Sequence, residues 1–147
     1  MPDRRLTARQ KRAVAERAGR RCEYCLTPAA YSSDPFSAEH IRPRSAGGTH
    51  DSSNLAYSCL GCNNFKYTHT EALDPTTGET VVLHHPRRDR WNDHFEWSDD
   101  YTQVVGLTAT GRATVERLQL NRPGVVNLRR VLRLAGVHPP SERTEPA

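Results

Sequence analysis

The chain has 147 residues, which is close to the usual size of one compact domain. Hydrophobic residues make up 35% of it and aromatic residues 7%, so we expect a thin apolar core that needs a metal or another cross-link. No segment approaches the roughly 20 apolar residues of a membrane span, and the first residues lack the apolar stretch of a signal peptide. These features argue against a membrane-spanning protein and predict a cytoplasmic one, whose 4 cysteines are metal ligands rather than disulfide partners.

Positive charge is concentrated at the two ends of the chain. Lys and Arg number 21 against 17 Asp and Glu, but residues 1–21 alone carry 8 basic and 2 acidic side chains, and residues 111–147 carry 7 and 3. The segment 71–110 has the opposite balance, with 3 basic and 8 acidic side chains. Basic surfaces suit a polyanion such as nucleic acid, because Lys and Arg displace counterions from phosphates. An ordinary solvated face explains the same charges, so charge alone does not decide the partner.

Capping residues and hydrophobic spacing predict a mixture of short helices and strands. Thr7 can cap a first helix that ends before Gly19. The remaining elements, in chain order, are a strand over 36–41, a turn at Pro43 and Gly47-Gly48, a second strand over 55–58, a short helix over 59–67, extended segments over 80–83 and 103–107, a helix from a Thr110 cap to about Leu120, and a last helix over about 124–135. No repeat and no long Pro/Gly/Ser linker divides the chain, so one core is expected.

The four cysteines form two pairs with the same spacing, Cys22-x-x-Cys25 and Cys59-x-x-Cys62. Two thiolates on one tight turn can approach a tetrahedral zinc from adjacent corners, and two such pairs complete a site with no open position. The spacing therefore predicts a structural zinc rather than a catalytic one. The 33 residues between the pairs exceed the roughly 15 to 20 of a simple zinc ribbon, so a substantial element is inserted. Buried free cysteines and a redox-active Cys-x-x-Cys pair are the alternatives.

The segment between and just after the cysteine pairs carries an ordered set of polar residues and glycines. It contains, in order, Glu39-His40, Pro43, Gly47-Gly48, Asn54-Leu55, Asn63 and Lys66. This pattern resembles the HNH endonuclease family. The later segments DPTTGE, HPRRDRW, HFEW and GLTATGRATVERLQLNR resemble a bacterial subgroup of stand-alone HNH proteins with a four-cysteine zinc site. The resemblance covers most of residues 8–136, and its function-bearing motif is confined to 22–66.

The resemblance implies an α+β fold with a zinc-stapled ββα-metal core, also called the His-Me finger, to which terminal helices and a short hairpin are added. It implies a single HNH nuclease domain over residues 1–136, with the catalytic and zinc core at about 20–70 and a basic helical part at about 108–136. Residues 137–147 are expected to form a disordered tail.

Hydrolysis of a phosphodiester needs a base for water, a cation for the developing charge and groups that hold the phosphate in line. His40 is the candidate general base, because imidazole titrates near neutral pH, and an acceptor must hold its second ring nitrogen. Glu39 and Asn63 offer hard oxygen ligands, which suit magnesium or manganese. By analogy with the family, Asn54 braces the loop after His40 and positions the scissile phosphate. Lys66 lies on nearly the same helical face as Asn63, where it could neutralise a phosphate.

Two features of the motif bear on its activity. Consecutive strand residues face opposite ways, so Glu39 and His40 share one site only if the bend required by Pro43 begins early or the strand is distorted. The chain also has Glu39 where the family pattern commonly has Asp, and Asn63 where it commonly has His, which favours hard metals over nickel or zinc. Without the cysteine pairs on either side, the same two residues would be interpreted as a surface acid, Glu39, beside a packed histidine, His40.

Basic side chains near the motif and in the last helix are candidates for contact with DNA. The candidates are Arg42, Lys66, Arg129, Arg130 and Arg133. The apolar stripe expected in the last helix is Val125, Leu128, Leu132 and Ala135, which leaves its arginines at the surface. There they would either grip phosphates or only solubilise the helix.

The other histidines and the aromatic residues carry weaker signals. The other histidines are expected at the surface or in packing, because their spacing forms no second metal site. The exception is the adjacent pair His84-His85, whose side chains would point to opposite faces of a strand. The histidines concerned are His50, His69, His84, His85, His94 and His138. Trp91, Phe95 and Trp97 are expected to form a small core rather than a platform for stacked bases.

The sequence therefore predicts a metal-dependent HNH endonuclease that hydrolyses DNA phosphodiester bonds, with His40 activating water. The expected cofactors are a structural zinc and a catalytic magnesium or manganese, and the expected partner is DNA, with no membrane and no small-molecule substrate. The principal alternative is a non-catalytic, zinc-stabilised DNA-binding module. A zinc module that binds another protein is a third class, which predicts neither DNA affinity nor cleavage. The sequence assigns no oligomeric state.

Overall fold

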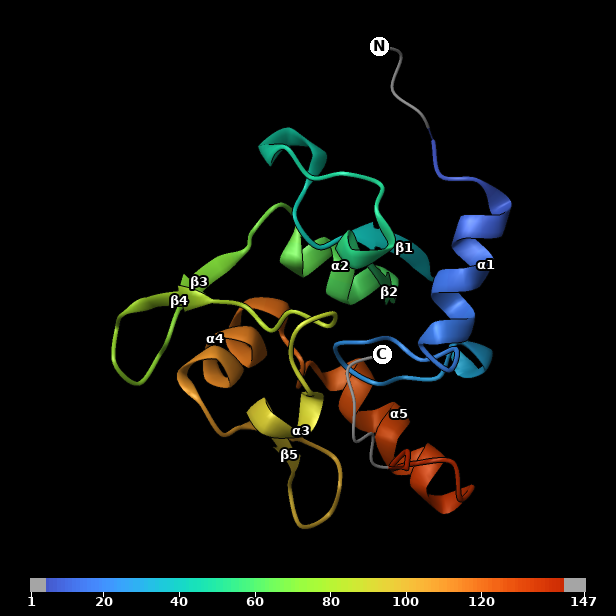
Figure 1. Cartoon of the computed structure of the whole chain (residues 1–147). Coiled ribbons are helices and arrows are strands. Elements are labelled where there is room, and N and C mark those ends of the chain that lie inside the picture. The colour runs from blue at the N-terminus through green and yellow to red at the C-terminus, as the bar shows by residue number, and fades with distance from the viewer. Residues whose placement is uncertain (1–4, 142–147) are drawn as a thin grey trace.

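The computed structural model describes residues 5–141 as a mixed α+β chain (Figure 1). Within these residues the strands form three two-stranded antiparallel sheets, and helices lie at both ends of the chain and between the sheets. No helix in the described part is long and apolar enough to cross a membrane. The predicted α+β class is confirmed, although there are more hairpins than the sequence predicts.

The elements are short, and the strands pair in consecutive twos, β1 with β2, β3 with β4 and β5 with β6. The helices are α1 (Ala8–Arg17), α2 (Leu60–Lys66), α3 (Trp91–His94), α4 (Ala109–Leu118) and α5 (Pro123–Leu134). The strands are β1 (Ser37–His40), β2 (Leu55–Ser58), β3 (Glu71–Leu73), β4 (Thr80–Val82), β5 (Phe95–Trp97) and β6 (Val104–Gly106). Single 3₁₀ turns occur at Ala29–Tyr31, Arg44–Ala46 and Ser52–Asn54.

A reciprocal cap holds the start of α1, as the sequence predicts. Thr7 Oγ1 accepts the Gln10 N–H at 3.1 Å, and Gln10 Oε1 accepts the Thr7 N–H at 2.7 Å. Val14 and Ala15 are buried, and α1 contacts both strands of the β1–β2 hairpin. The first helix therefore packs along the hairpin (Figure 1).

The hairpin and α2 form a continuous ββα unit. β1 and β2 pair with Ser37 opposite Ser58 and His40 opposite Leu55. β2 leads directly into α2, whose N-cap is Cys59. The strand expected over 55–58 and the short helix expected over 59–67 are both confirmed. The long connection 41–54 projects beyond the end of the hairpin, at the top of Figure 1.

The sequence does not predict β3, α3 and β5. Each has only three or four residues, too few for a strand or helix periodicity to be recognised. α4 also begins earlier than expected, because its N-cap is Thr108, whose Oγ1 accepts the Gly111 N–H at 3.0 Å. Thr110 lies inside the helix, so the prediction that it is the cap is wrong.

The core joins both halves of the chain around the cysteines. Buried Phe95, Leu118 and Leu120 belong to the same hydrophobic cluster as the four cysteines. Trp91 and Trp97 pack against this cluster with their ring centroids 5.2 Å apart. The expectation that these aromatic residues form a small core is confirmed, and the thin core has its cysteines at the centre.

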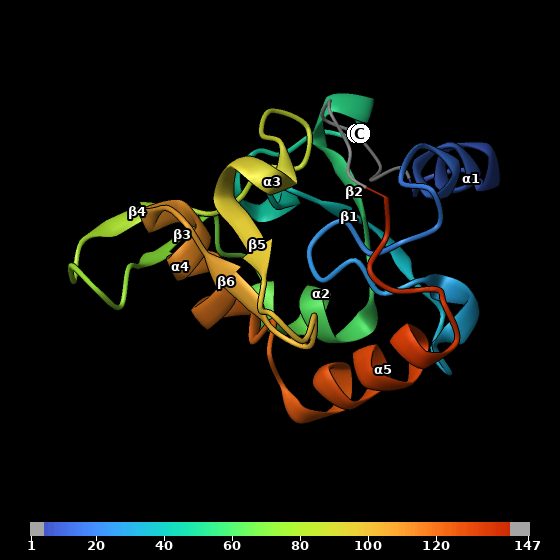
Figure 2. The same ribbon diagram turned by 90° about the horizontal axis from the view of Figure 1, so that it is seen from below.

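α5 turns inward a face that matches the expected one only in part, since Val125 and Leu132 are buried and Leu128 is half-buried. Its buried residues are Val125, Val126, Arg129 and Leu132, whereas Ala135 is exposed. Arg129 reaches inward because its guanidinium donates to the backbone carbonyls of Thr102 and Leu120, both at 2.9 Å. Figure 1 places α5 at the opposite end of the molecule from the 41–54 connection, and Figure 2 shows α1 and the β3–β4 hairpin on opposite sides.

The described end of the chain is packed against the fold. His138 is buried, its Nε2 lies 2.7 Å from the Tyr101 carbonyl oxygen, and its ring lies 4.5 Å from that of Trp97. The Val137 carbonyl accepts a hydrogen bond from Arg21 at 2.9 Å. The expectation of a disordered tail therefore does not hold for Val137 and His138, and its last part, 142–147, lies outside the described residues.

An ion pair ties the β3–β4 hairpin to α4. Arg112 donates to both carboxylate oxygens of the buried Asp74, at 2.9 Å from Nε and 2.8 Å from Nη2. Asp74 also accepts the Thr76 N–H and the Thr77 hydroxyl, which closes the turn between the two strands. These hydrogen bonds, that from Arg112 above all, lower the pKa of Asp74 below its ordinary value. The carboxylate therefore stabilises the fold in its ionised form.

We expect Asp74→Asn to lower the melting temperature by several degrees at pH 7, because an amide cannot accept both hydrogen bonds from Arg112. The lowered pKa means that Asp74 contributes fully above its unfolded pKa of about 4 and that this contribution is lost as the pH falls below it. Thermal unfolding should therefore show a smaller deficit at about pH 3. Asp99→Asn, at an exposed carboxylate, is the control and should melt with the parent. A deficit of equal size at both pH values would contradict the role assigned to the charge.

Candidate functional site

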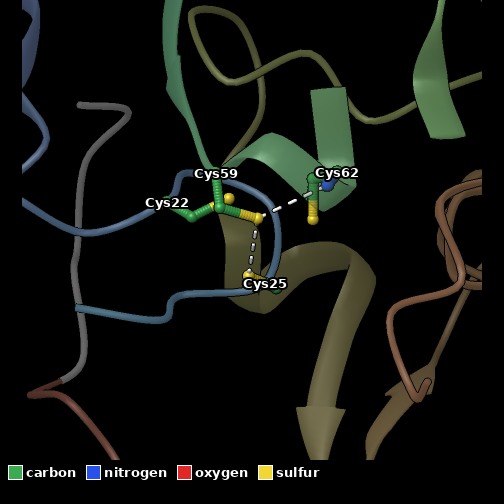
Figure 3. Close-up of side chains that lie close together, drawn as sticks. All are labelled: Cys22, Cys25, Cys59 and Cys62. Atoms are coloured by element: carbon green, nitrogen blue, oxygen red, sulfur yellow. Dashed lines mark hydrogen bonds between the residues drawn. The ribbon is translucent and has the colours of Figure 1, made fainter. Parts of the chain in front are cut away.

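Two segments far apart in the sequence bring their cysteines to one point. Figure 3 shows Cys22 and Cys25, from the turn after α1, facing Cys59 and Cys62, from the start of α2. The four sulfurs all lie within 4.8 Å of one another, and Cys25 Sγ lies 3.7 Å from Cys59 Sγ. Sulfur ligands about 2.3 Å from a tetrahedral zinc lie about 3.8 Å apart, so this spacing fits a closed thiolate site. No disulfide is present, since all four cysteines are free.

One neighbouring side chain, Arg122, supplies positive charge to these sulfurs. The Arg122 guanidinium lies 3.4 Å from Cys59 Sγ and 3.7 Å from Cys62 Sγ. Hydrogen bonds between the sulfurs, first that with Cys22, lower the pKa of Cys25, whereas burial raises the pKa of Cys22 well above its ordinary value. Four thiolates buried this close together repel one another, so they ionise together only beside a cation. The donor set therefore suits a structural zinc, with Arg122 offsetting part of the thiolate charge.

β1 sends its last two side chains to opposite sides. Directly paired residues of an antiparallel sheet share a face, so His40 lies on the face of Leu55 and Glu39 on the face of Ala56. β1 is regular through His40, and the bend at Pro43 comes only after it. The early bend or distorted strand that a shared site requires is therefore absent from this hairpin.

A second imidazole holds His40. His40 Nε2 lies 2.8 Å from His50 Nδ1, and the Arg44 guanidinium lies 2.6 Å from His50 Nε2. One ring nitrogen donates to the other, so the contact orients the His40 ring. The sequence predicts His50 at the surface or in packing and does not reveal this contact, because no spacing rule links two histidines across a loop.

One side-chain amide closes the loop after His40. Asn54 Oδ1 accepts the Arg42 N–H at 2.8 Å, and Asn54 Nδ2 donates to the carbonyls of Arg42 and Thr49 at 3.0 and 2.9 Å. Gly47 adopts a φ of +85°, and a side chain at Gly48 would overlap the Arg42 carbonyl, which explains the two glycines. The Asn54 amide therefore braces the loop through its backbone. Its contact with a scissile phosphate stays a prediction.

Glu39 forms a buried ion pair on the other face of the hairpin. Lys66 Nζ lies 2.9 Å from Glu39 Oε1 and donates to the Ile41 carbonyl at 2.8 Å. The Tyr24 hydroxyl donates to the same carboxylate at 3.3 Å. The Lys66 and Glu39 side chains are only 1% and 4% exposed. Burial raises the pKa of Glu39 and Lys66 opposes this shift, so the carboxylate depends on Lys66 to remain ionised.

This ion pair changes the roles expected for two residues. Lys66 is buried against Glu39, so the expectation that it meets a phosphate at the surface does not hold. The Glu39 carboxylate is directed at Lys66 and Tyr24, so Glu39 and Asn63 do not form a ready magnesium site in this arrangement. Asn63 is half-buried on α2, and its role as a metal ligand stays a prediction.

The ββα unit and the four-cysteine cluster fall within one stretch of the chain. Residues 22–69 match the family model of the HNH endonucleases. These residues are an HNH endonuclease domain. No curated protein and no solved structure matches the chain. The HNH domain contains both cysteine pairs, β1, β2 and α2, so its match coincides with the predicted ββα-metal core.

The HNH domain borders a cleft of about 690 Å³. The 41–49 segment and Lys66 form one side of this cleft, and the segment from His84 to Asp89 forms the other. Arg42, a candidate for DNA contact, is exposed at the cleft, where its Nε donates to the Ala46 carbonyl at 2.8 Å. His40 is not among the described residues that line the cleft, because it lies on the opposite face of β1.

The arginines of α5 do not form the predicted phosphate-binding set. Arg129 is 2% exposed and is bonded to backbone carbonyls, so the prediction that it grips phosphate is wrong. Arg130 and Arg133 are exposed. Arg133 already donates to the Asp100 carbonyl at 2.8 Å and covers the Tyr101 ring at 4.6 Å. The helix α5 itself lies at the far end of the molecule from the 41–54 connection of the HNH domain (Figure 1).

Tyr24 and Arg122 also contribute to the HNH domain without having been predicted. Tyr24 lies between the first two cysteines, so its burial beside the cluster could have been expected from its position alone. Arg122 comes 60 residues after Cys62, and no sequence signal connects the two.

We expect Lys66→Met to destabilise the protein by about 3–5 kcal/mol at pH 7, because it leaves the Glu39 carboxylate buried without its partner. Because burial raises the pKa of Glu39, the carboxyl takes up a proton more readily as the pH falls. The difference in stability between Lys66→Met and the parent should therefore become smaller at low pH. The double variant Lys66→Met, Glu39→Gln should recover most of the loss. Denaturant unfolding of the parent, both single variants and the double variant measures the coupling. A double variant no more stable than Lys66→Met alone would contradict the pairing.

We expect the folded protein to release about one zinc ion per chain when a mercurial reagent titrates its four thiols. Cys25→Ser should release less zinc and unfold at a lower temperature, because one thiolate ligand is lost. A metal-sensitive dye follows the release while circular dichroism follows the fold. A folded parent that releases no zinc, or a disulfide within either cysteine pair, would contradict the assignment.

Proposed function

We propose that this protein is a metal-dependent endonuclease that hydrolyses DNA, with His40 as the general base for water. The observation that carries the proposal is the placement of His40 at the end of β1 of the HNH domain, with its ring oriented by His50 and the following loop braced by Asn54. An imidazole ring that is held in one orientation can accept a proton from water.

In the proposed reaction the water oxygen bonds to phosphorus while a ring nitrogen of His40 takes its proton. The bond from phosphorus to the 3′ oxygen breaks, and the leaving oxygen keeps the electron pair and takes a proton from solvent water. The products are a 5′-phosphate and a 3′-hydroxyl, as the family resemblance implies. A magnesium or manganese ion, when bound, supplies positive charge for the phosphate. Binding of that ion through Glu39 and Asn63 beside His40 requires Lys66 to give up its contact with the Glu39 carboxylate. It also requires the end of β1 to rearrange, because Glu39 and His40 face opposite sides of the strand.

Support for a nucleic-acid substrate comes from the surface beside His40. α1 and His50 line one pocket, so α1 borders the face of the hairpin on which His40 lies. Arg9, Lys11 and Arg12 are exposed on α1. Such a basic helix suits the phosphate backbone of DNA.

The four cysteines are proposed to bind the structural zinc that holds the ββα unit together. Their burial, their spacing and the closed donor set support this assignment. Zinc at this point does not take part in hydrolysis, because four thiolates leave it no open position.

One observation favours the alternative of a non-catalytic, zinc-stabilised DNA-binding module. Glu39 faces away from His40 and is neutralised by Lys66, so the acidic residue of the motif does not stand beside the base. A module of this kind binds DNA with the same dependence on salt but does not cut it. Cleavage therefore separates the two functions.

We expect the parent to nick supercoiled plasmid in the presence of magnesium or manganese, and His40→Ala to do so about 100- to 10,000-fold more slowly, the range for loss of a general base. DNA affinity at fixed salt should change little, because a base acts on the transition state rather than on ground-state binding. Nicking rates from gel assays and affinities from fluorescence anisotropy measure the two effects.

His69→Ala is the matched control, because it removes an exposed imidazole of the same domain and should cut like the parent. If His40→Ala cuts as fast as the parent, the assigned mechanism is wrong. If the folded parent binds DNA but does not cut it with either metal, the DNA-binding module replaces the nuclease.

A further inference from the structure

Outside the HNH domain, three metal-ligating side chains converge between β4 and β5. They are His84 after β4, Asp89 in the following turn and His94 at the end of α3. One ligand atom of each lies within 4.8 Å of the other two. We propose that His84, Asp89 and His94 bind a divalent first-row transition-metal ion, at a site separate from the four cysteines. The sequence predicts no second metal site among these histidines, because their spacing matches no ligand motif.

The distances between the donor atoms suit ligands of one ion better than hydrogen bonds. His84 Nδ1 lies 3.8 Å from Asp89 Oδ2, and His94 Nε2 lies 3.5 Å from the same oxygen. Hydrogen bonds between nitrogen and oxygen extend only to about 3.2 Å. Ligands about 2.1 Å from a tetrahedral ion lie about 3.4 Å apart. A small contraction of the three side chains would therefore complete the site.

His84 carries an unpaired ring nitrogen in the interior. The residue is 2% exposed, and none of the described residues hydrogen-bonds to its Nδ1. Buried polar atoms without a partner are rare, because they lose their hydration without compensation. Burial also lowers the pKa of His84 to about 3, so the ring is neutral at physiological pH and can present a lone pair to a cation. A metal ion at Nδ1 would supply the partner that the protein does not.

Threonines at the start of α4 and within it contact both histidines through atoms other than the proposed metal ligands. Thr114 Oγ1 accepts the backbone N–H of His84 at 2.9 Å. Thr108 Oγ1 lies 2.6 Å from His94 Nδ1, which leaves His94 Nε2 turned toward the cluster. Metal-bound imidazoles commonly donate the other ring N–H to such an acceptor. Gly111 permits this close approach, because a side chain there would overlap the His94 carbonyl.

The carboxylate is oriented as well, and the site opens onto the cleft. Asp89 Oδ2 accepts the His85 N–H at 2.9 Å, and the Asp89 N–H donates to the His85 carbonyl at 2.8 Å. Two imidazoles and one carboxylate suit ions such as zinc, cobalt or manganese and leave coordination positions open. His84 and Asp89 line the 690 Å³ cleft, so the proposed site lies across this cleft from the 41–54 connection of the HNH domain.

Cobalt titration of the full chain tests the proposal, with zinc kept at the four cysteines and looser ions removed by a weak chelator. The parent should bind about one Co²⁺ per chain and show visible d–d bands without the sulfur-to-metal charge transfer of a thiolate site. Asp89→Asn and His94→Gln each remove one ligand and should weaken binding by about 100-fold or more, at least as much as loss of an outer-shell partner. Asp93→Asn and His69→Gln make the same changes at exposed side chains and should bind like the parent.

Circular dichroism checks that each variant is folded. The proposal is overturned if the folded parent takes up no cobalt outside the cysteines, or if Asp89→Asn and His94→Gln bind it as the controls do. If a ligand variant does not fold, paramagnetic shifts of the His84 and His94 ring resonances in the parent decide the matter. The readout is metal binding, so the result does not depend on whether the HNH domain cleaves DNA.

Discussion

Four cysteine sulfurs lie close together in the interior of this protein. This arrangement constrains the path of the chain both between the two cysteine pairs and after the second pair. The two pairs are separated by 33 residues, which must leave Cys25 and return to Cys59 at the same place. A hairpin satisfies this condition, because antiparallel strands bring distant residues side by side. α2 begins at Cys59 itself, so the cysteine turn also sets the direction of the helix. Phe95 and Leu118 pack against the same cluster, so the C-terminal half is built on it as well.

The alternation of side chains along β1 divides the chemistry of the HNH domain between two faces. His40 and His50 stand on the face that α1 borders, whereas Glu39 and Lys66 stand on the face toward α2. The loop braced by Asn54 connects β1 to β2. It lies at the end of the hairpin, where both faces of the sheet meet. A slip of one residue in the pairing of β1 would exchange these faces, so the register decides which chemistry each side carries.

Features that carry a local signal were accessible from the sequence, and features that depend on distant partners were not. Cysteine spacing and the Thr7 cap follow from a few adjacent residues, and both appear where they are expected. Lys66 and Arg129 have the charge of phosphate-binding groups, but long aliphatic stems let them reach a buried carboxylate and buried carbonyls. The contact between His40 and His50 arises only when the loop folds back. Strands of three residues, such as β3 and β5, gain their order from a partner strand rather than from their own periodicity.

The contact of the Arg122 guanidinium with two of the cysteine sulfurs affects whether such a domain can be transferred to another protein by gene fusion. Arg122 lies well beyond residue 69, and so do Leu118 and Leu120, which share the core of the cysteines. Residues 22–69 taken alone would lose the cation beside their thiolates and expose the apolar side of the cluster. The segment that matches the family, residues 22–69, is therefore shorter than the part of the chain that forms the hydrophobic core around the cysteines. A gene fusion that transplanted only this segment would need a host able to provide a new cation and a new apolar cover at the same place.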